Sequence, residues 1–64
     1  MTEISAHETV GLALLMNAIE WARINIDNEH WSWNWVRVER GGCDVVMKFK
    51  YEEDAIIFRL MFGL

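Results

Sequence analysis

Three tryptophans that alternate with small polar residues, Trp31-Ser32-Trp33-Asn34-Trp35, constrain the fold more than any other feature of the chain. Alternation of this kind places every second side chain on the same face of a β-strand. A Gly41-Gly42 pair follows, and beyond it runs a second alternating series: Cys43, Val45, Met47, Phe49 and Tyr51. Two alternating runs on either side of a glycine pair predict a β-hairpin with one strongly aromatic face.

Two loop lengths are compatible with this hairpin. A two-residue turn at Gly41-Gly42 would set Trp35 opposite Lys48 and place the tryptophans against the polar face of the second strand. A three-residue loop over residues 40–42 pairs Trp35 with Met47 instead and gathers the aromatic side chains on one face. We favour the second register. The opposite face then collects Ser32, Asn34, Val36, Val38, Asp44, Val46, Lys48 and Lys50.

A helix is expected before the hairpin and another after it. Ser5 and Glu8 have the spacing of a capping box, which predicts that the first helix begins there and ends within residues 25–28. The second helix is expected to start near Glu52, where three acidic residues complement the positive end of the helix dipole. The apolar stripe of the first helix is Leu12, Leu15, Ile19, Ala22 and Ile26, and the second helix is apolar nearly all round.

These elements predict an α+β fold of order α-β-β-α, in which residues 1–64 form a single domain and both helices cover the aromatic face of an antiparallel hairpin. A chain of this size buries only about 60% of the surface that its unfolded form exposes. Because 53% of its residues are hydrophobic and four are tryptophan, we expect a homodimer to complete the core. The candidate interface consists of Val10, Leu14, Trp21, Trp31, Trp33 and Trp35, and an open hairpin edge offers a further pairing site.

Composition narrows the possible partners. Six basic and ten acidic residues give a net charge of −4, which disfavours a nucleic-acid-binding surface. The longest apolar run, residues 10–16, is too short for a membrane span, and the N-terminus lacks the basic region of a signal peptide. A single cysteine excludes an internal disulfide and favours a reducing cytoplasm.

The candidate residues for chemistry are scattered along the chain. Cys43 has no histidine near it in sequence, and His7 and His30 lie at opposite ends of the expected first helix. The acidic run at residues 52–54 is explained by a helix N-terminus. We therefore predict no catalytic, metal or cofactor site and no enzymatic activity. An enzyme that uses Cys43 or a histidine at a subunit interface is the least favoured hypothesis.

The C-terminal segment from Phe49 to Gly63 contains the residues Asp54-Ala55, Phe58-Arg59-Leu60 and Phe62-Gly63. In this pattern it resembles the ends of small uncharacterised proteins encoded by tailed bacteriophages, including those that infect marine cyanobacteria. The resemblance covers about a quarter of the chain. It implies a viral origin and synthesis in a bacterial host, and it implies no activity or site residues.

The sequence thus favours a small non-catalytic interaction protein that oligomerises and binds a host or viral macromolecule. The alternative is a nucleic-acid-binding module, for which the candidate basic surface is Arg37, Lys48 and Lys50 on the outer hairpin face.

Overall fold

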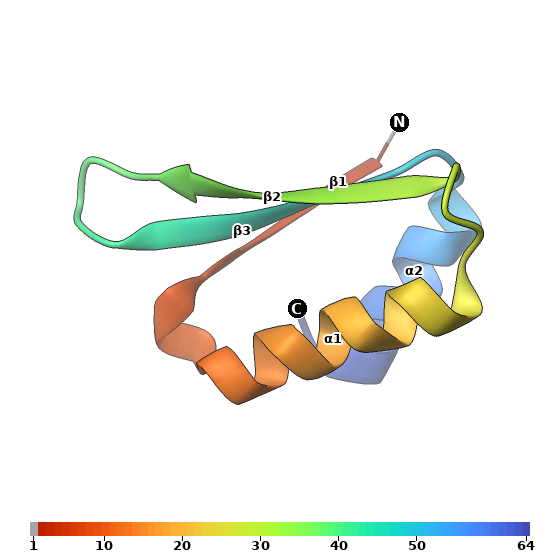
Figure 1. Cartoon of the computed structure of the whole chain (residues 1–64), viewed down its shortest axis with the longest axis horizontal. Coiled ribbons are helices and arrows are strands. Elements are labelled where there is room, and N and C mark those ends of the chain that lie inside the picture. The colour runs from red at the N-terminus through yellow and green to blue at the C-terminus, as the bar shows by residue number, and fades with distance from the viewer. Residues whose placement is uncertain (1) are drawn as a thin grey trace.

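The computed structural model describes residues 2–64 and contains three strands and two α-helices (Figure 1). In chain order the elements are β1 (Thr2–His7), the 3-10 helix η1 (Glu8–Val10), α1 (Leu12–Asn25), β2 (Trp31–Arg37), β3 (Cys43–Phe49) and α2 (Glu52–Phe62). The predicted α+β class, with a helix on each side of a β-hairpin in the sequence, is confirmed.

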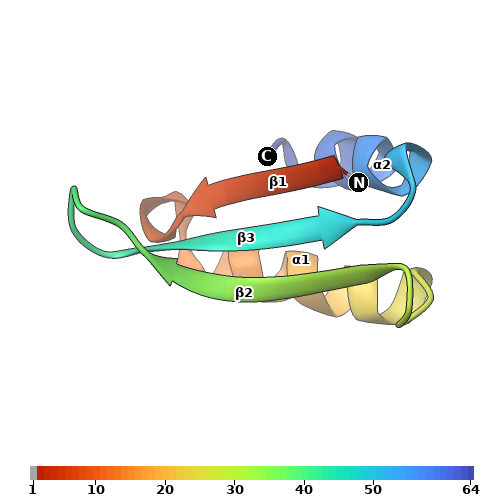
Figure 2. The ribbon, with the colours of Figure 1, turned by 90° about the horizontal axis from the view of Figure 1, so that it is seen from above.

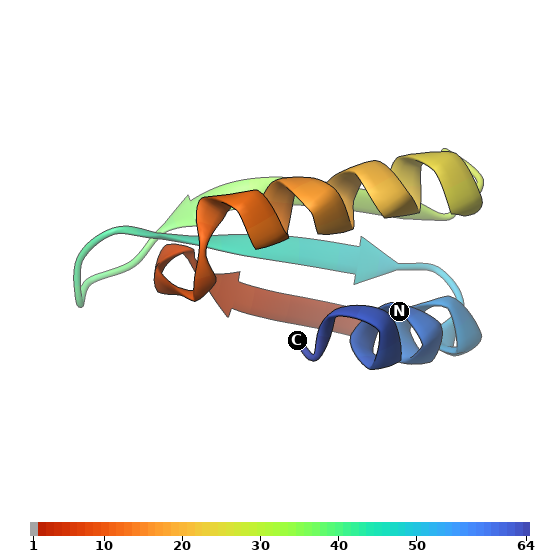
Figure 3. The same cartoon turned by 90° about the horizontal axis from the view of Figure 1, so that it is seen from below.

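The strands form one antiparallel sheet in the order β1-β3-β2, and both helices lie against the same face of it. Viewed from above and from below, α1 runs beneath β2 and α2 lies beneath the β1 side (Figures 2 and 3). The opposite face of the sheet is left uncovered by the elements within residues 2–64. The predicted placement of both helices on one face of the hairpin is therefore correct.

The hairpin has the predicted face but not the predicted register. Trp35 lies opposite Val45, two residues away from its expected partner Met47. The loop spans five residues, 38–42, and is closed by a hydrogen bond from the Val38 N–H to the Gly42 carbonyl at 3.2 Å. A shift of two residues keeps every side chain on its face, so the tryptophans still share a face with Met47 and Phe49.

The N-terminal segment is a strand, and the prediction of a capping box there is wrong. Ser5 lies within β1 and pairs with Val46, while Glu8 begins the 3-10 helix. Ile4 and Ala6 alternate with polar neighbours and are only 5% and 7% exposed. Without β1, one edge of β3 would lack backbone hydrogen-bond partners. Pairing along that edge stabilises a strand at residues 2–7 more than a local cap stabilises a helix there.

The helix ends follow from local chemistry. The first helix ends at Asn25, within the predicted window, and Ile26 is extended. The second helix starts at Glu52 as predicted and ends before Gly63, whose φ of +66° suits a residue without a side chain. Of the predicted stripe, Leu15, Ala22 and Ile26 are buried and Ile19 packs against the core, whereas Leu12 is 60% exposed. Ala18 is also buried.

The core lies between β3 and the two helices. The Phe49 ring sits 5.3 Å from the Phe58 ring of α2. Trp21 of α1 packs edge-on against Phe58 and Phe62, at 6.1 and 5.9 Å between ring centroids. Aromatic contacts therefore join the central strand to both helices. The fully buried larger side chains are Leu15, Val45, Met47, Phe49 and Phe58.

Candidate interaction surface

The inward-facing tryptophans of β2 are only partly covered. Trp31 is half-buried against the core, whereas Trp33 and Trp35 are each 39% exposed. Their rings meet edge to face at 6.1 Å. Because β2 lies at the edge of the sheet, its inward side chains have α1 beneath them but no strand on their outer side. The two indoles therefore form an apolar ridge along one side of the molecule, here called the indole ridge (Trp33 and Trp35).

A hollow of about 330 Å³ lies beside this ridge at the junction of α1 and β2. Its lining consists of Ile19, Arg23, Asn28, Trp31, Ser32 and Trp33. Arg23 is the only charged lining residue, and its guanidinium forms an ion pair with Glu20 on the same helix. The hydrogen bond from Arg23 lowers the pKa of the Glu20 carboxyl and raises that of Arg23. The hollow thus combines three apolar with three polar lining residues, and its one charged group is paired with Glu20.

The outer edge of β2 carries backbone groups that face away from the sheet. The Val38 N–H binds the Gly42 carbonyl, and the Lys50 N–H binds the His30 carbonyl at 2.8 Å. Both bonds involve even-numbered residues that flank β2. In an antiparallel pair the backbone groups of successive residues point alternately toward the partner strand and away from it, so the even-numbered residues of β2 bind β3 and the odd-numbered residues face outward. In agreement, the Trp35 N–H binds the side-chain oxygen of its neighbour Asn34 at 3.0 Å.

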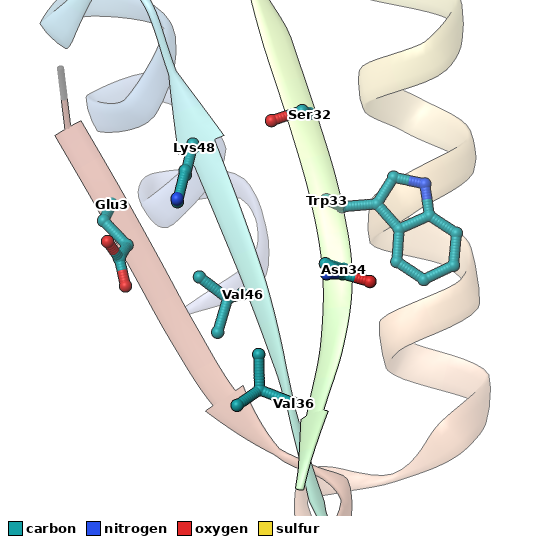
Figure 4. Close-up of a pocket in the computed structure, with 7 residues that line it drawn as sticks. All are labelled: Glu3, Ser32, Trp33, Asn34, Val36, Val46 and Lys48. Carbon is teal, nitrogen blue, oxygen red and sulfur yellow. The ribbon is translucent and has the colours of Figure 1, made fainter.

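The uncovered face of the sheet is shallow and mixed in character. A hollow of about 440 Å³ there is lined mainly by side chains from all three strands (Figure 4). The close-up shows Trp33 pointing toward α1, whereas Glu3, Val46 and Lys48 lie over the sheet. Glu3 and Lys48 are opposite one another in the β1–β3 register. Opposite charges side by side over a flat sheet favour neither an anionic nor a cationic ligand.

The structure brings two of the three predicted basic residues together. Lys48 and Lys50 line a hollow of about 310 Å³ with Glu29, His30, Trp31 and Ser32. Arg37 lies at the far end of β2 opposite Cys43 and follows the alternation of the tryptophans. The predicted basic surface is therefore divided, and acidic Glu29 and Glu3 lie close to its lysines.

The predicted interface residues have different environments. Trp21 and Trp31 pack against the core of the single chain, and Leu14 is half-buried. Val10, in η1, is 44% exposed. Only Val10 and the indole ridge thus remain as substantially exposed members of the predicted set.

Sequence reasoning missed a second apolar surface on α2. Leu60 and Met61 are 81% and 58% exposed, and Ile56 and Ile57 are about half exposed. These four residues form the outer face of α2. The apolar character of this helix on all sides was the available signal, but a short helix does not reveal from sequence which side its sheet covers.

His7, Glu8 and Cys43 meet where β1 ends. The Thr9 N–H donates to His7 Nδ1 at 3.2 Å, which leaves Nε2 to donate to the Gly41 carbonyl at 2.9 Å. The Glu8 carboxylate accepts the Cys43 N–H at 3.3 Å. These contacts fasten the end of β1 to the hairpin loop, which gives both side chains a structural role.

Cys43 itself is half-buried, and His30 stacks edge-on against Tyr51 at 4.9 Å. Among residues 2–64, no cluster of three or more histidine, cysteine or acidic residues is placed to hold a metal ion. In the same part of the chain, no helix combines the length and apolar character needed to cross a membrane.

Comparisons with protein-family models, with curated proteins and with solved structures found no match to this chain. The candidate surfaces therefore rest on the geometry described above.

Proposed function

We propose that this chain is a small non-catalytic interaction protein with two apolar surfaces of different use. The outer face of α2 joins two copies, and the side formed by β2 and α1 binds a protein partner. The observation that supports this most strongly is that six of the exposed large apolar side chains gather in these two places, Trp33 and Trp35 on β2 and four residues on α2. Contiguous apolar patches of this kind mark interaction sites on small proteins.

Self-association through α2 is the simplest way to cover that helix. Leu60, the most exposed large apolar residue described, lies in the last turn of α2, on the helix face between Ile56 and Ile57. Burying a side chain of this size contributes roughly 1.5–3 kcal/mol. A two-fold axis through the helix face would place the same four residues of each copy in contact.

The resemblance of residues 49–63 to the ends of tailed-bacteriophage proteins supports a viral origin. We therefore propose that the protein acts in the cytoplasm of a bacterial host and that its partner is a host or viral protein. Nucleic acid is the weaker alternative, because Arg37 lies apart from Lys48 and Lys50 and the net charge is negative.

Self-association is tested by sedimentation at micromolar concentration with a matched pair of variants. Leu60→Lys and Ile24→Lys each place a lysine in the last turn of a helix, at side chains that are 81% and 67% exposed. We expect the wild type and Ile24→Lys to sediment as a dimer, at twice the chain mass of 7.6 kDa, and Leu60→Lys as a monomer. A monomeric wild type would refute the dimer.

Partner binding is tested by affinity capture from a bacterial lysate with the wild type and with a double variant, Trp33→Ser and Trp35→Ser. We expect a captured protein that is lost with the double variant but retained by Leu60→Lys. Capture that does not depend on the indole ridge would refute the assignment of this surface.

A further inference from the structure

We propose that the free edge of β2 binds an extended peptide segment of the partner as a fourth strand of the sheet. The segment has apolar side chains at alternate positions and a carboxylate near each end. This inference rests on the proposed function, because it specifies what the side formed by β2 and α1 recognises. The partner then binds by adding a strand to the sheet, and not by packing a folded surface against it.

The backbone of β2 is prepared for such pairing. The outward-facing N–H and C=O groups belong to the odd-numbered residues 31, 33, 35 and 37, as the β2–β3 hydrogen bonds require. These are the groups that an added antiparallel strand would bind. The Trp33 side chain points to the α1 side, and strand alternation places that of Trp35 on the same side. These two residues therefore offer hydrogen bonds at the edge and apolar contacts beneath it.

Little protects this edge from another strand. Natural sheets guard their free edges with charges, prolines, bulges or short strands. From Trp31 to Val36 the strand contains no charge and no proline, and its pairing with β3 is uninterrupted. The opposite edge of the sheet, β1, carries the charged residue Glu3.

The position of α1 decides between a second copy and an isolated segment. Because α1 runs directly beneath β2, a second copy paired through β2 would bring its own α1 alongside (Figures 2 and 3). Neighbouring strands are about 4.8 Å apart, whereas packed helices need 8–10 Å between their axes. A second copy would therefore collide with α1, while a single extended segment carries no helix and meets no such obstacle.

Side-chain contacts would favour alternate apolar residues in the segment. The apolar side chains of the segment that point to the α1 side would cover the indole ridge, which is now open to solvent. Next to the ridge, Ile19 and Trp33 line the hollow between α1 and β2. The other residues of the segment would face the uncovered side of the sheet beside Ser32 and Asn34, where polar side chains are compatible.

The charges around the edge favour carboxylates in the segment. Arg23, which is exposed and paired with Glu20, lines the hollow near the start of β2, and Arg37 ends the strand. No acidic residue lines that hollow in the part of the chain described, although the whole chain has a net charge of −4. A segment with an acidic residue near each end would meet one arginine at each end of the strand.

Asn34 competes with the segment for one donor. Its side-chain oxygen now accepts the Trp35 N–H, which a paired strand would also need. Binding must therefore turn the Asn34 side chain away. Its removal in Asn34→Ala should tighten binding roughly two- to tenfold, the value of one such hydrogen bond.

The experiment titrates the full-length protein with the synthetic peptide Glu-Val-Thr-Val-Thr-Val-Glu, capped at both ends, and follows backbone amides by NMR. We expect saturable binding below about 1 mM, with the largest shifts and new exchange protection at the amides of Trp33 and Trp35. A peptide with alternate N-methylated amides should not bind, and one with lysine in place of glutamate should bind at least tenfold more weakly.

Two variants separate main-chain pairing from apolar contact. Trp33→Ala removes the indole, and Trp33→Pro removes in addition the outward N–H without disturbing the bonds to β3. We expect weakened binding by the alanine variant and none by the proline variant, with unchanged circular dichroism in both. Equal binding by the two variants would overturn strand addition.

The remaining outcomes also decide between occupants. If the peptide does not bind, but Trp33→Pro turns the wild-type dimer into a monomer, a second copy occupies the edge and the inference is wrong. If the peptide does not bind, but lysate capture still depends on the indole ridge, the proposed function stands and strand addition fails.

Discussion

β2 and β3 carry the same alternating pattern on the same face of the sheet, yet their side chains have very different environments. Val45, Met47 and Phe49 of β3 are fully buried, whereas Trp33 and Trp35 of β2 remain 39% exposed. The difference arises because β3 has a strand on each side, while β2 has a neighbour on one side only. Alternation thus identifies the face that points inward, and the position in the sheet decides how much of it is buried.

The sharpest test of this comparison is Phe49→Ala in the central strand. Phe49 is fully buried and contacts Phe58, so its truncation leaves a cavity and removes an aromatic contact. We expect a loss of about 3–5 kcal/mol in the free energy of unfolding, measured by urea denaturation. For a chain of this size that loss is enough to leave a large unfolded fraction.

The loop that joins the two strands is the next most sensitive point. Gly42 has a φ of +77°, and a Cβ there would collide with the Glu8 carboxylate, whereas Gly41 has a φ of +101° and open space around it. We expect Gly42→Ala to cost about 2–3 kcal/mol and Gly41→Ala about 1 kcal/mol. Equal losses in thermal unfolding of the two variants would show that the contact between Glu8 and the loop is absent in solution.

The edge strand should tolerate a truncation that the central strand does not. Trp35→Ala removes a side chain that is already partly solvated, and we expect a loss of about 1–2 kcal/mol in the free energy of unfolding. A loss as large as that of Phe49→Ala, together with a melting temperature that rises with protein concentration, would mean that another chain covers the indole ridge.

The smallest effect concerns the charge beside the hollow. The hydrogen bond from Arg23 lowers the pKa of Glu20, so the pair contributes to stability at neutral pH and this contribution is lost as the pH falls through the carboxyl titration. Arg23→Gln should return the pKa of Glu20 toward its usual value, as seen by NMR titration of the side chain. Because both side chains are exposed, unfolding at pH 7 should hardly change.

Much of the fold could be predicted because its signals are local. The tryptophan alternation, the glycine pair and the acidic start of α2 depend on neighbours within a few residues, and each gave the correct element. Residues 2–7 were predicted wrongly because Ser5 and Glu8 match a helix cap in isolation. Their strand forms only because β3, some forty residues away, offers an unpaired edge.

The candidate site was accessible to sequence reasoning only in part. Trp33 and Trp35, named as candidate interface residues from composition and pattern, are exposed, whereas Trp21, named with them, packs against Phe58 and Phe62 of α2. The outer face of α2 was missed, because a helix that is apolar all round gives no sign of which side is covered.

The sequence by itself determined which residues share a face, because the periodicities of strands and helices follow from backbone geometry. Only the tertiary structure decided that β1 completes the sheet, that β2 is left at its edge, and that α1 lies beneath that edge. Those outcomes depend on competition between distant segments for the same hydrogen bonds and the same apolar surface. A short stretch of neighbouring residues does not reveal the outcome of that competition, because the competing segments lie far apart in the chain.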